Sequence, residues 1–140
     1  MAYGEGADPR NATLVTGQTV SGAGLLLKAT GALMETTDAG SDHIALGVSV
    51  GESSRAAGGD LDTAAGATVS YYPMGGTLMV QTEGSQTYTT GLVVYAGAAG
   101  QIIDSNDHTS KAIGIYVGEG DVTPAAGTLL PINTNSAVVA

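Results

Sequence analysis

Two histidines stand beside aspartates, and this pairing has the clearest chemical potential in the chain. His43 follows Asp42, and His108 follows Asp107. An imidazole beside a carboxylate can titrate near neutral pH or bind a metal ion. Each pair also stands just before an Ala-x-Gly segment, where Asp and its neighbours commonly form a solvated turn. We therefore expect both pairs to be turn residues.

Closely spaced acidic residues form a second group of candidates. The run Asp104-Ser105-Asn106-Asp107 resembles the start of a calcium-binding loop, and Asp60 and Asp62 form another acidic pair. A calcium loop also needs a central glycine and a late glutamate, which are missing after Asp104. The spacing therefore predicts an ordinary turn that is stabilised by Asp and Asn side chains.

Other motifs of catalysis and cofactor binding are incomplete. Gly22-Ala23-Gly24 and Gly118-Glu119-Gly120 are fragments of glycine-rich loops, but neither continues into a phosphate-binding motif. Glu52 and Glu119 each follow a Val-Gly pair, which favours a repeated turn over a catalytic carboxylate. The sequence has no Gly-x-Ser-x-Gly elbow and no cysteine. We expect no enzyme activity, no cofactor and no metal ion.

Composition narrows the class of partner. The 140 residues include 13 acidic and 4 basic ones, which gives a net charge of −9. This charge disfavours nucleic acid and anionic membranes, both of which attract clustered basic residues. No apolar run is long enough to span a membrane, and the N-terminus lacks the pattern of an export signal. The acidity fits either simple solubility or adaptation to high salt.

An internal repeat indicates the elements that must position these residues. Two blocks recur in one register at an offset of 67 residues: 24–29 with 91–96, and 45–52 with 112–119. A third block, 64–66, recurs as 125–127 at an offset of 61. The first copy therefore carries six extra residues before the third block, and we expect a surface loop there. The chain is therefore a tandem duplication of one module. A single copy of this module would bury too little surface to be robust on its own.

The pattern inside each copy is that of β-structure. Short apolar or alternating runs, bounded by Gly, Thr, Asp and Asn, predict strands at residues 25–29, 44–50, 77–81, 92–96, 112–117 and 128–132. We expect an all-β fold, a small pseudo-symmetric β-barrel or sandwich built from the duplicated module. The expected parts of this one compact domain are an extended N-terminal arm (1–12), a first repeat (13–82) and a second repeat (83–140).

Alternation predicts which side chains face the core. Ile44, Leu46, Val48 and Val50 are expected on the buried face of the first copy, and the matching positions of the second are Ile113, Ile115 and Val117. The intervening Gly47 and Gly114 occupy equivalent positions inside these strands. A bulge, a sharp bend or a close backbone approach would explain both glycines. With 22 glycines and no Cys, Trp or Phe, we expect a core of small side chains.

The repeat follows a recognisable pattern: a small-residue turn into a strand (21–27), then Leu/Ile-Gly-Val/Ile-x-Val, then an Ala-Gly turn and a further strand (65–70). In this respect the chain resembles, over about residues 13 to 135, the capsid decoration (cement) proteins of tailed bacteriophages and related archaeal viruses. The resemblance implies a small β-barrel-like fold without enzymatic activity. It also implies binding to the major capsid protein on the outer face of the virion, often as a homo-trimer, after synthesis in the host cytoplasm. The low lysine content of this chain is a departure from the family, and it argues against docking that is steered by charge.

We therefore expect a structural virion protein that binds and stabilises a capsid. The arm contributes the candidate contact residues: Tyr3, Gly4, Glu5, Asp8, Pro9, Arg10 and Asn11. Such a polar, glycine-rich arm could add a strand to a neighbour or to the shell.

Two alternatives stay open. One is another viral structural β-protein, such as a head-fibre base, a tail-tube component or a fibre component. The other is a carbohydrate-binding β-module, for which Tyr71, Tyr72 and Tyr88 are the clustered aromatic candidates.

Overall fold

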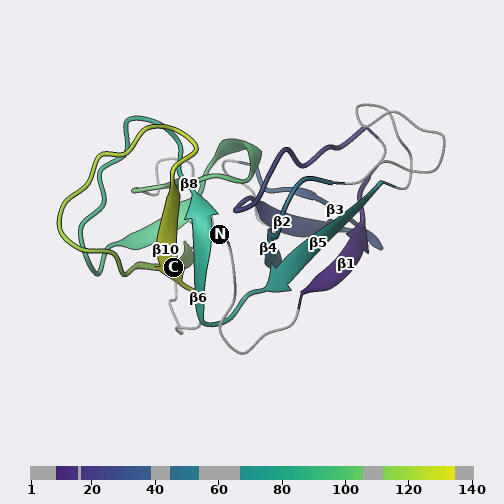
Figure 1. Ribbon diagram of the computed structural model, residues 1–140, viewed down its shortest axis with the longest axis horizontal. Helices are drawn as coiled ribbons and strands as arrows, with labels where there is room; N and C mark the ends of the chain where they lie inside the picture. The colour runs from purple at the N-terminus through teal and green to yellow at the C-terminus, as the bar shows by residue number, and fades with distance from the viewer. Residues whose placement is uncertain (1–8, 16, 39–44, 54–66, 106–111, 135–140) are drawn as a thin grey trace.

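The computed structural model describes residues 9–15, 17–38, 45–53, 67–105 and 112–134. These residues form two five-stranded antiparallel sheets that pack against each other, which confirms the expected all-β class (Figure 1). The strands are β1 (Arg10–Thr13), β2 (Leu26–Thr30), β3 (Leu33–Thr36), β4 (Gly47–Ser49), β5 (Thr68–Pro73), β6 (Thr77–Gln81), β7 (Val93–Ala96), β8 (Ile102–Ile103), β9 (Ala112–Tyr116) and β10 (Leu129–Asn133). A short 3-10 helix, η1 (Ala98–Gly100), connects β7 to β8.

The two sheets have the same strand order. The first is ordered β1-β5-β4-β2-β3, and the second β6-β10-β9-β7-β8, so each strand corresponds to the fifth one after it. The registers repeat as well: Val48 pairs with Leu26 and Tyr72, just as Ile115 pairs with Val93 and Asn133. These pairs reproduce the sequence offsets of 67 and 61 (Val48 to Ile115, Tyr72 to Asn133). The tandem repeat is therefore a structural repeat.

The sheets divide the chain differently from the expected boundary after residue 82. Strand β6 pairs with β10 and belongs to the second sheet, while its counterpart β1 pairs with β5 in the first. We call Arg10–Pro73 the first unit and Thr77–Asn133 the second unit; in Figure 1 they lie side by side, the first on the right. Residues 10–12, expected in an extended arm, are instead the edge strand of the first sheet. Sequence comparison missed this pair because β1 and β6 share almost no residue types.

Each predicted strand run overlaps an observed strand, and 77–81 has the predicted bounds, whereas β2 and β10 each end one residue later than predicted. Strand β4 is shorter than predicted, at Gly47–Ser49. The sequence pattern missed β1, β3 and β8, which are short or polar and lie at or near the sheet edges. Strands β1 and β3 carry a weak alternation signal because they are short and largely polar or exposed, and β8 carries none because it has only two residues, both buried.

Each sheet has two distinguishable faces. In the first unit, Leu25 and Leu27 join one buried cluster, while Leu26 points to the opposite side and joins the cluster of the second unit. We call the side of Leu27, and of its counterpart Val94, the core face, and the opposite side the back face. The back face of the first sheet therefore packs against the second unit.

The predicted buried alternation is wrong at several positions. Leu46 is 45% exposed and Val117 is 42% exposed, whereas Tyr116, expected on the opposite side, is buried. The strand pairing explains the second copy, because a β-bulge between Val94 and Tyr95 leaves Ile113 as an extra residue and shifts the alternation.

Gly47 and Gly114 are explained by close backbone approach, one of the expected reasons. A Cβ atom at Gly47 would lie within 3.0 Å of the Tyr72 carbonyl oxygen and of the Tyr71 ring. At Gly114 it would collide with the Asn133 carbonyl group. The two units therefore use a glycine at the same point, where the strand contacts its neighbour most tightly.

Candidate functional site

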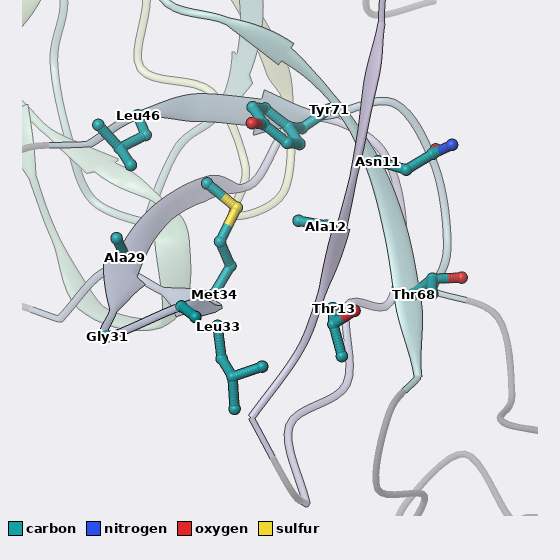
Figure 2. A pocket seen from close by; sticks show the side chains of 11 residues that line it. Asn11, Ala12, Thr13, Ala29, Gly31, Leu33, Met34, Leu46, Thr68 and Tyr71 are labelled. Carbon is teal, nitrogen blue, oxygen red and sulfur yellow. The ribbon is translucent and has the colours of Figure 1, made fainter.

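A surface cavity of about 440 Å³ opens on the core face of the first unit (Figure 2). Strand β1 forms one wall, the β2–β3 hairpin forms the opposite wall, and Leu46 and Tyr71 lie at one end. The Met34 side chain extends between these walls toward Tyr71. Leu33 and Leu46, both exposed large apolar residues, border the cavity.

The cavity lining is a mixture of apolar and polar surface without charged side chains. Ala12, Met34 and Tyr71 face the cavity, whereas the Asn11 and Thr68 side chains point away from it (Figure 2), and no Asp, Glu, His, Lys or Arg is among the lining residues. Such a surface can bury apolar side chains and pair with a backbone segment. Its chemistry suits recognition of another surface.

The corresponding surface of the second unit is covered by the first unit. The N–H of Gln81 donates to the carbonyl of Gly24 at 2.8 Å, and its side-chain amide donates to the carbonyl of Ala23 at 2.8 Å. The N–H of Gly100 donates to the carbonyl of Thr37 at 2.9 Å. The segment around Gly24 therefore lies against the edge strand β6 and the turn η1.

Close packing accompanies these hydrogen bonds. A Cβ at Gly24, which has φ +90°, would collide with the Leu129 side chain and lie 3.2 Å from the Met79 carbonyl oxygen. A Cβ at Gly100 would lie 3.0 Å from the Leu26 carbonyl oxygen. Leu26 and Val48 are fully buried in one cluster with the core of the second unit.

The predicted arm residues fall into two groups. Tyr3, Gly4, Glu5 and Asp8 lie outside the described residues. Pro9 is exposed just before β1, and Arg10 and Asn11 are the exposed first two residues of β1. The Ser70 hydroxyl donates to the Asn11 side-chain oxygen at 2.7 Å, and Asn11 also borders the cavity. Whether these residues contact a capsid stays a prediction.

The polar candidates are not brought together into a site. His43, His108, Asp60 and Asp62 lie outside the described residues. The carboxylate of Asp104 accepts the N–H of Thr87 at 2.7 Å, while its own N–H donates to the side-chain oxygen of Gln86 at 2.8 Å. Asp104 therefore ties the end of β8 to the loop before β7, as a turn-stabilising residue does. Glu52 and Glu119 are exposed, and the described part of the chain holds no cluster of three metal-ligating side chains.

Tyr88 is buried in the second unit, contrary to the reading of the tyrosines as an exposed cluster. Its hydroxyl shares a hydrogen bond with the Thr82 hydroxyl and donates to the Ile102 carbonyl at 3.1 Å, and its ring packs against Tyr116 at 5.7 Å between centroids. Burial raises the pKa of Tyr88 to about 12.

The cavity residues Leu33 and Leu46 were missed by sequence reasoning. Both belong to apolar runs of ordinary strand type, and Leu46 was expected to be buried. Leu46 and Ile113 stand at the same place in the two repeats, directly before Gly47 and Gly114. Leu46 is nevertheless exposed, whereas Ile113 is buried. Two differences separate their exposures: Ile113 is the extra residue of the β-bulge, and the first unit covers the second.

No protein family model matches this sequence, and no curated protein matches it either. Among the described residues, no helix has the length and apolar character needed to cross a membrane.

Proposed function

We propose that this protein is a structural component of a virion that binds the outer surface of the capsid and stabilises it. The proposal starts from the repeat pattern, in which the chain resembles capsid decoration proteins. The observation that carries it is the uncharged cavity, bordered by the exposed Leu33 and Leu46, on a duplicated all-β scaffold. Exposed apolar side chains beside an edge strand form a surface to which a segment of another protein can bind.

The residue types at this surface fit assembly better than sugar binding. Tyr71 and Tyr72 are adjacent in β5 and point to opposite faces of the sheet, Tyr71 to the cavity and Tyr72 to the core of the second unit. Tyr88 is buried. The described tyrosines of this group therefore form no common platform for stacking a sugar ring, and the carbohydrate-binding alternative loses the residues that suggested it.

Capsid binding can be tested directly by co-sedimentation. We expect the protein to sediment with shells assembled from the major capsid protein of the same genome, and to raise the temperature at which the shells disrupt. Expanded and unexpanded shells should both be used, because decoration sites commonly depend on the arrangement of shell subunits. Absence of binding to both forms would refute the proposal.

The N-terminal residues can be tested in the same assay. Deleting residues 2–8 removes Tyr3, Gly4, Glu5 and Asp8 but leaves β1, so we expect an unchanged melting temperature and reduced occupancy of the shell. A matched control changes Thr123, which is exposed in the second unit, to Ala. Full occupancy of the shell by the deletion variant would show that residues 2–8 do not contribute to capsid binding.

A further inference from the structure

The contact between the two units is not symmetric. The first unit contributes its back face and the Gly24 segment, while the second contributes the edge of β6, the turn η1 and its core-face opening. Because the two units share one fold, each side of this contact has a second copy elsewhere in the molecule. The first unit still has its own core-face opening, and the second unit still has its own back face.

The cavity of the first unit is the uncovered equivalent of the surface that the second unit uses. Strand registers and the repeat offset place the cavity residues Ala12, Tyr71 and Leu46 where the second unit has Val80, Ile132 and Ile113. Those three residues of the second unit share one buried cluster with Leu26, Ala45 and Val48 of the first unit. The same registers place Thr13 of β1 where β6 has Gln81, and the β2–β3 turn at Gly31 and Ala32, which also lines the cavity, corresponds to η1. The cavity is therefore the counterpart of the surface on which the second unit receives the back face of the first.

The backbone edge is also positioned for this contact. The N–H of Leu14 donates to Ala67, just as the N–H of Thr82 donates to Thr128. Because N–H directions alternate along a strand, the N–H of Thr13 points to the outer edge of the sheet, as that of Gln81 does. Gln81 uses this N–H to bind the carbonyl of Gly24.

The matching donor surface lies on the second unit. Gly91 is the counterpart of Gly24 and has φ +92° against +90°, but a Cβ at Gly91 would meet nothing within 4 Å. Val93 and Ile115 pair on the back face, at the place where the first unit has the buried pair of Leu26 and Val48, and both are only half-buried. Within the described part of the chain, this segment repeats the back face of the first unit but is less covered than it.

We propose that the protein self-associates head to tail, with the Gly91–Val93 back face of one copy seated in the Leu46 cavity of the next. The new contact repeats the one between the units of a single chain. Such a heterologous contact builds a ring if its rotation closes and a filament if it does not. This inference does not depend on capsid binding.

Two local differences make the contact between copies weaker than the one within a chain. Thr13 lacks the long side-chain amide with which Gln81 binds Ala23, and the two-residue Gly31-Ala32 turn is shorter than η1. Each copy also carries a net charge of −9, so like-charge repulsion opposes assembly. We therefore expect association to depend on concentration and to strengthen with salt.

Sedimentation velocity on two complementary variants tests the proposal. Leu46→Glu places a charge in the cavity, and Val93→Glu places one on the back face that would enter it. Thr123→Glu is the matched control, since Thr123 is exposed and belongs to neither surface. We expect wild type and control to assemble, and each single variant to raise the dissociation constant at least about tenfold.

Mixing the two variants decides the geometry. Each chain then retains one intact surface, so an equimolar mixture should form a dimer that grows no further, as only one productive contact remains. Leu33→Glu serves as a second cavity variant, and circular dichroism verifies that every variant is folded. The proposal is overturned if wild type stays monomeric up to about 500 µM, if folded variants assemble like wild type, or if the mixture stays monomeric.

Discussion

At the scale of single residues, the structure assigns physical roles to positions that the sequence only marked as unusual. Gly47 and Gly114 interrupt strands at matching places because a side chain there would strike a neighbouring carbonyl group. Tyr88 is fully buried, and the Thr82 hydroxyl and the Ile102 carbonyl satisfy its hydroxyl. In a core of small side chains, these few tight contacts define the packing.

A methyl group at Gly114 should be costly. We expect Gly114→Ala to lower the free energy of unfolding by about 1 to 3 kcal/mol, because the added Cβ collides with the Asn133 backbone. Gly51→Ala is the control, since a Cβ at Gly51 meets nothing within 4 Å and its effect should stay within about 0.5 kcal/mol. Urea unfolding measures both, and equal stability of the two variants would contradict the close-approach explanation.

The raised pKa of Tyr88 predicts sensitivity to alkaline pH. The folded value of about 12 lies above the ordinary 10.0, so the folded state holds its proton more tightly than the unfolded state. Its contribution to stability is therefore complete below about pH 10 and is lost as the pH rises toward 12. Urea unfolding between pH 9 and pH 12 should show this loss, and Tyr88→Phe should show less of it. An equal decline in both proteins would assign the effect to other groups.

At the scale of secondary structure elements, β1 changes the role of the N-terminal region. It was expected as part of a free arm, but Arg10–Thr13 closes the first sheet against β5. Its counterpart β6 does the same in the second sheet, where its outer edge binds the first unit. The strand at this position is therefore an edge strand in both sheets, and in the second unit its outer edge also binds the first unit.

Truncation should separate the strand from the residues before it. Deleting residues 2–8 should leave the melting temperature nearly unchanged, whereas deleting residues 2–13 should lower it by at least about 5 °C because β1 is lost. Differential scanning calorimetry gives both values. Equal melting temperatures would mean that β1 adds little to the stability of the sheet.

At the scale of the whole molecule, the two units share a core. Leu26, Ala45 and Val48 from the first sheet belong to the same buried cluster as the core of the second unit. Neither unit can separate without exposing this apolar surface to water. We therefore expect the described units to unfold together in one transition.

A matched pair of truncations measures the asymmetry between the units. Leu26→Ala should cost about 2 to 5 kcal/mol, since Leu26 is fully buried between the units. Val93→Ala, at the equivalent place on the open back face, should cost about 1 kcal/mol or less in the monomer. Chemical denaturation at low protein concentration compares them. Similar costs would mean that the two back faces are equally buried.

The sequence alone determined the β class, the duplication and most of the central strands, because alternating apolar residues and repeated glycines are local signals. It also singled out Gly47 and Gly114 as unusual positions inside strands, and the structure decided among a bulge, a bend and a close approach. It did not reveal β1 as the counterpart of β6, since β1 buries little of its surface and its residue types have diverged from those of β6.

Only the tertiary structure decided which apolar residues stay exposed. Leu46 and Ile113 stand in the same place in the two repeats, yet one is 45% exposed and the other 7%. The difference arises in part from the β-bulge at Ile113 and in part from an asymmetric contact in which the first unit covers the second and nothing in the described chain covers the first. A contact of this kind joins residues that are distant in sequence, so no local pattern records it.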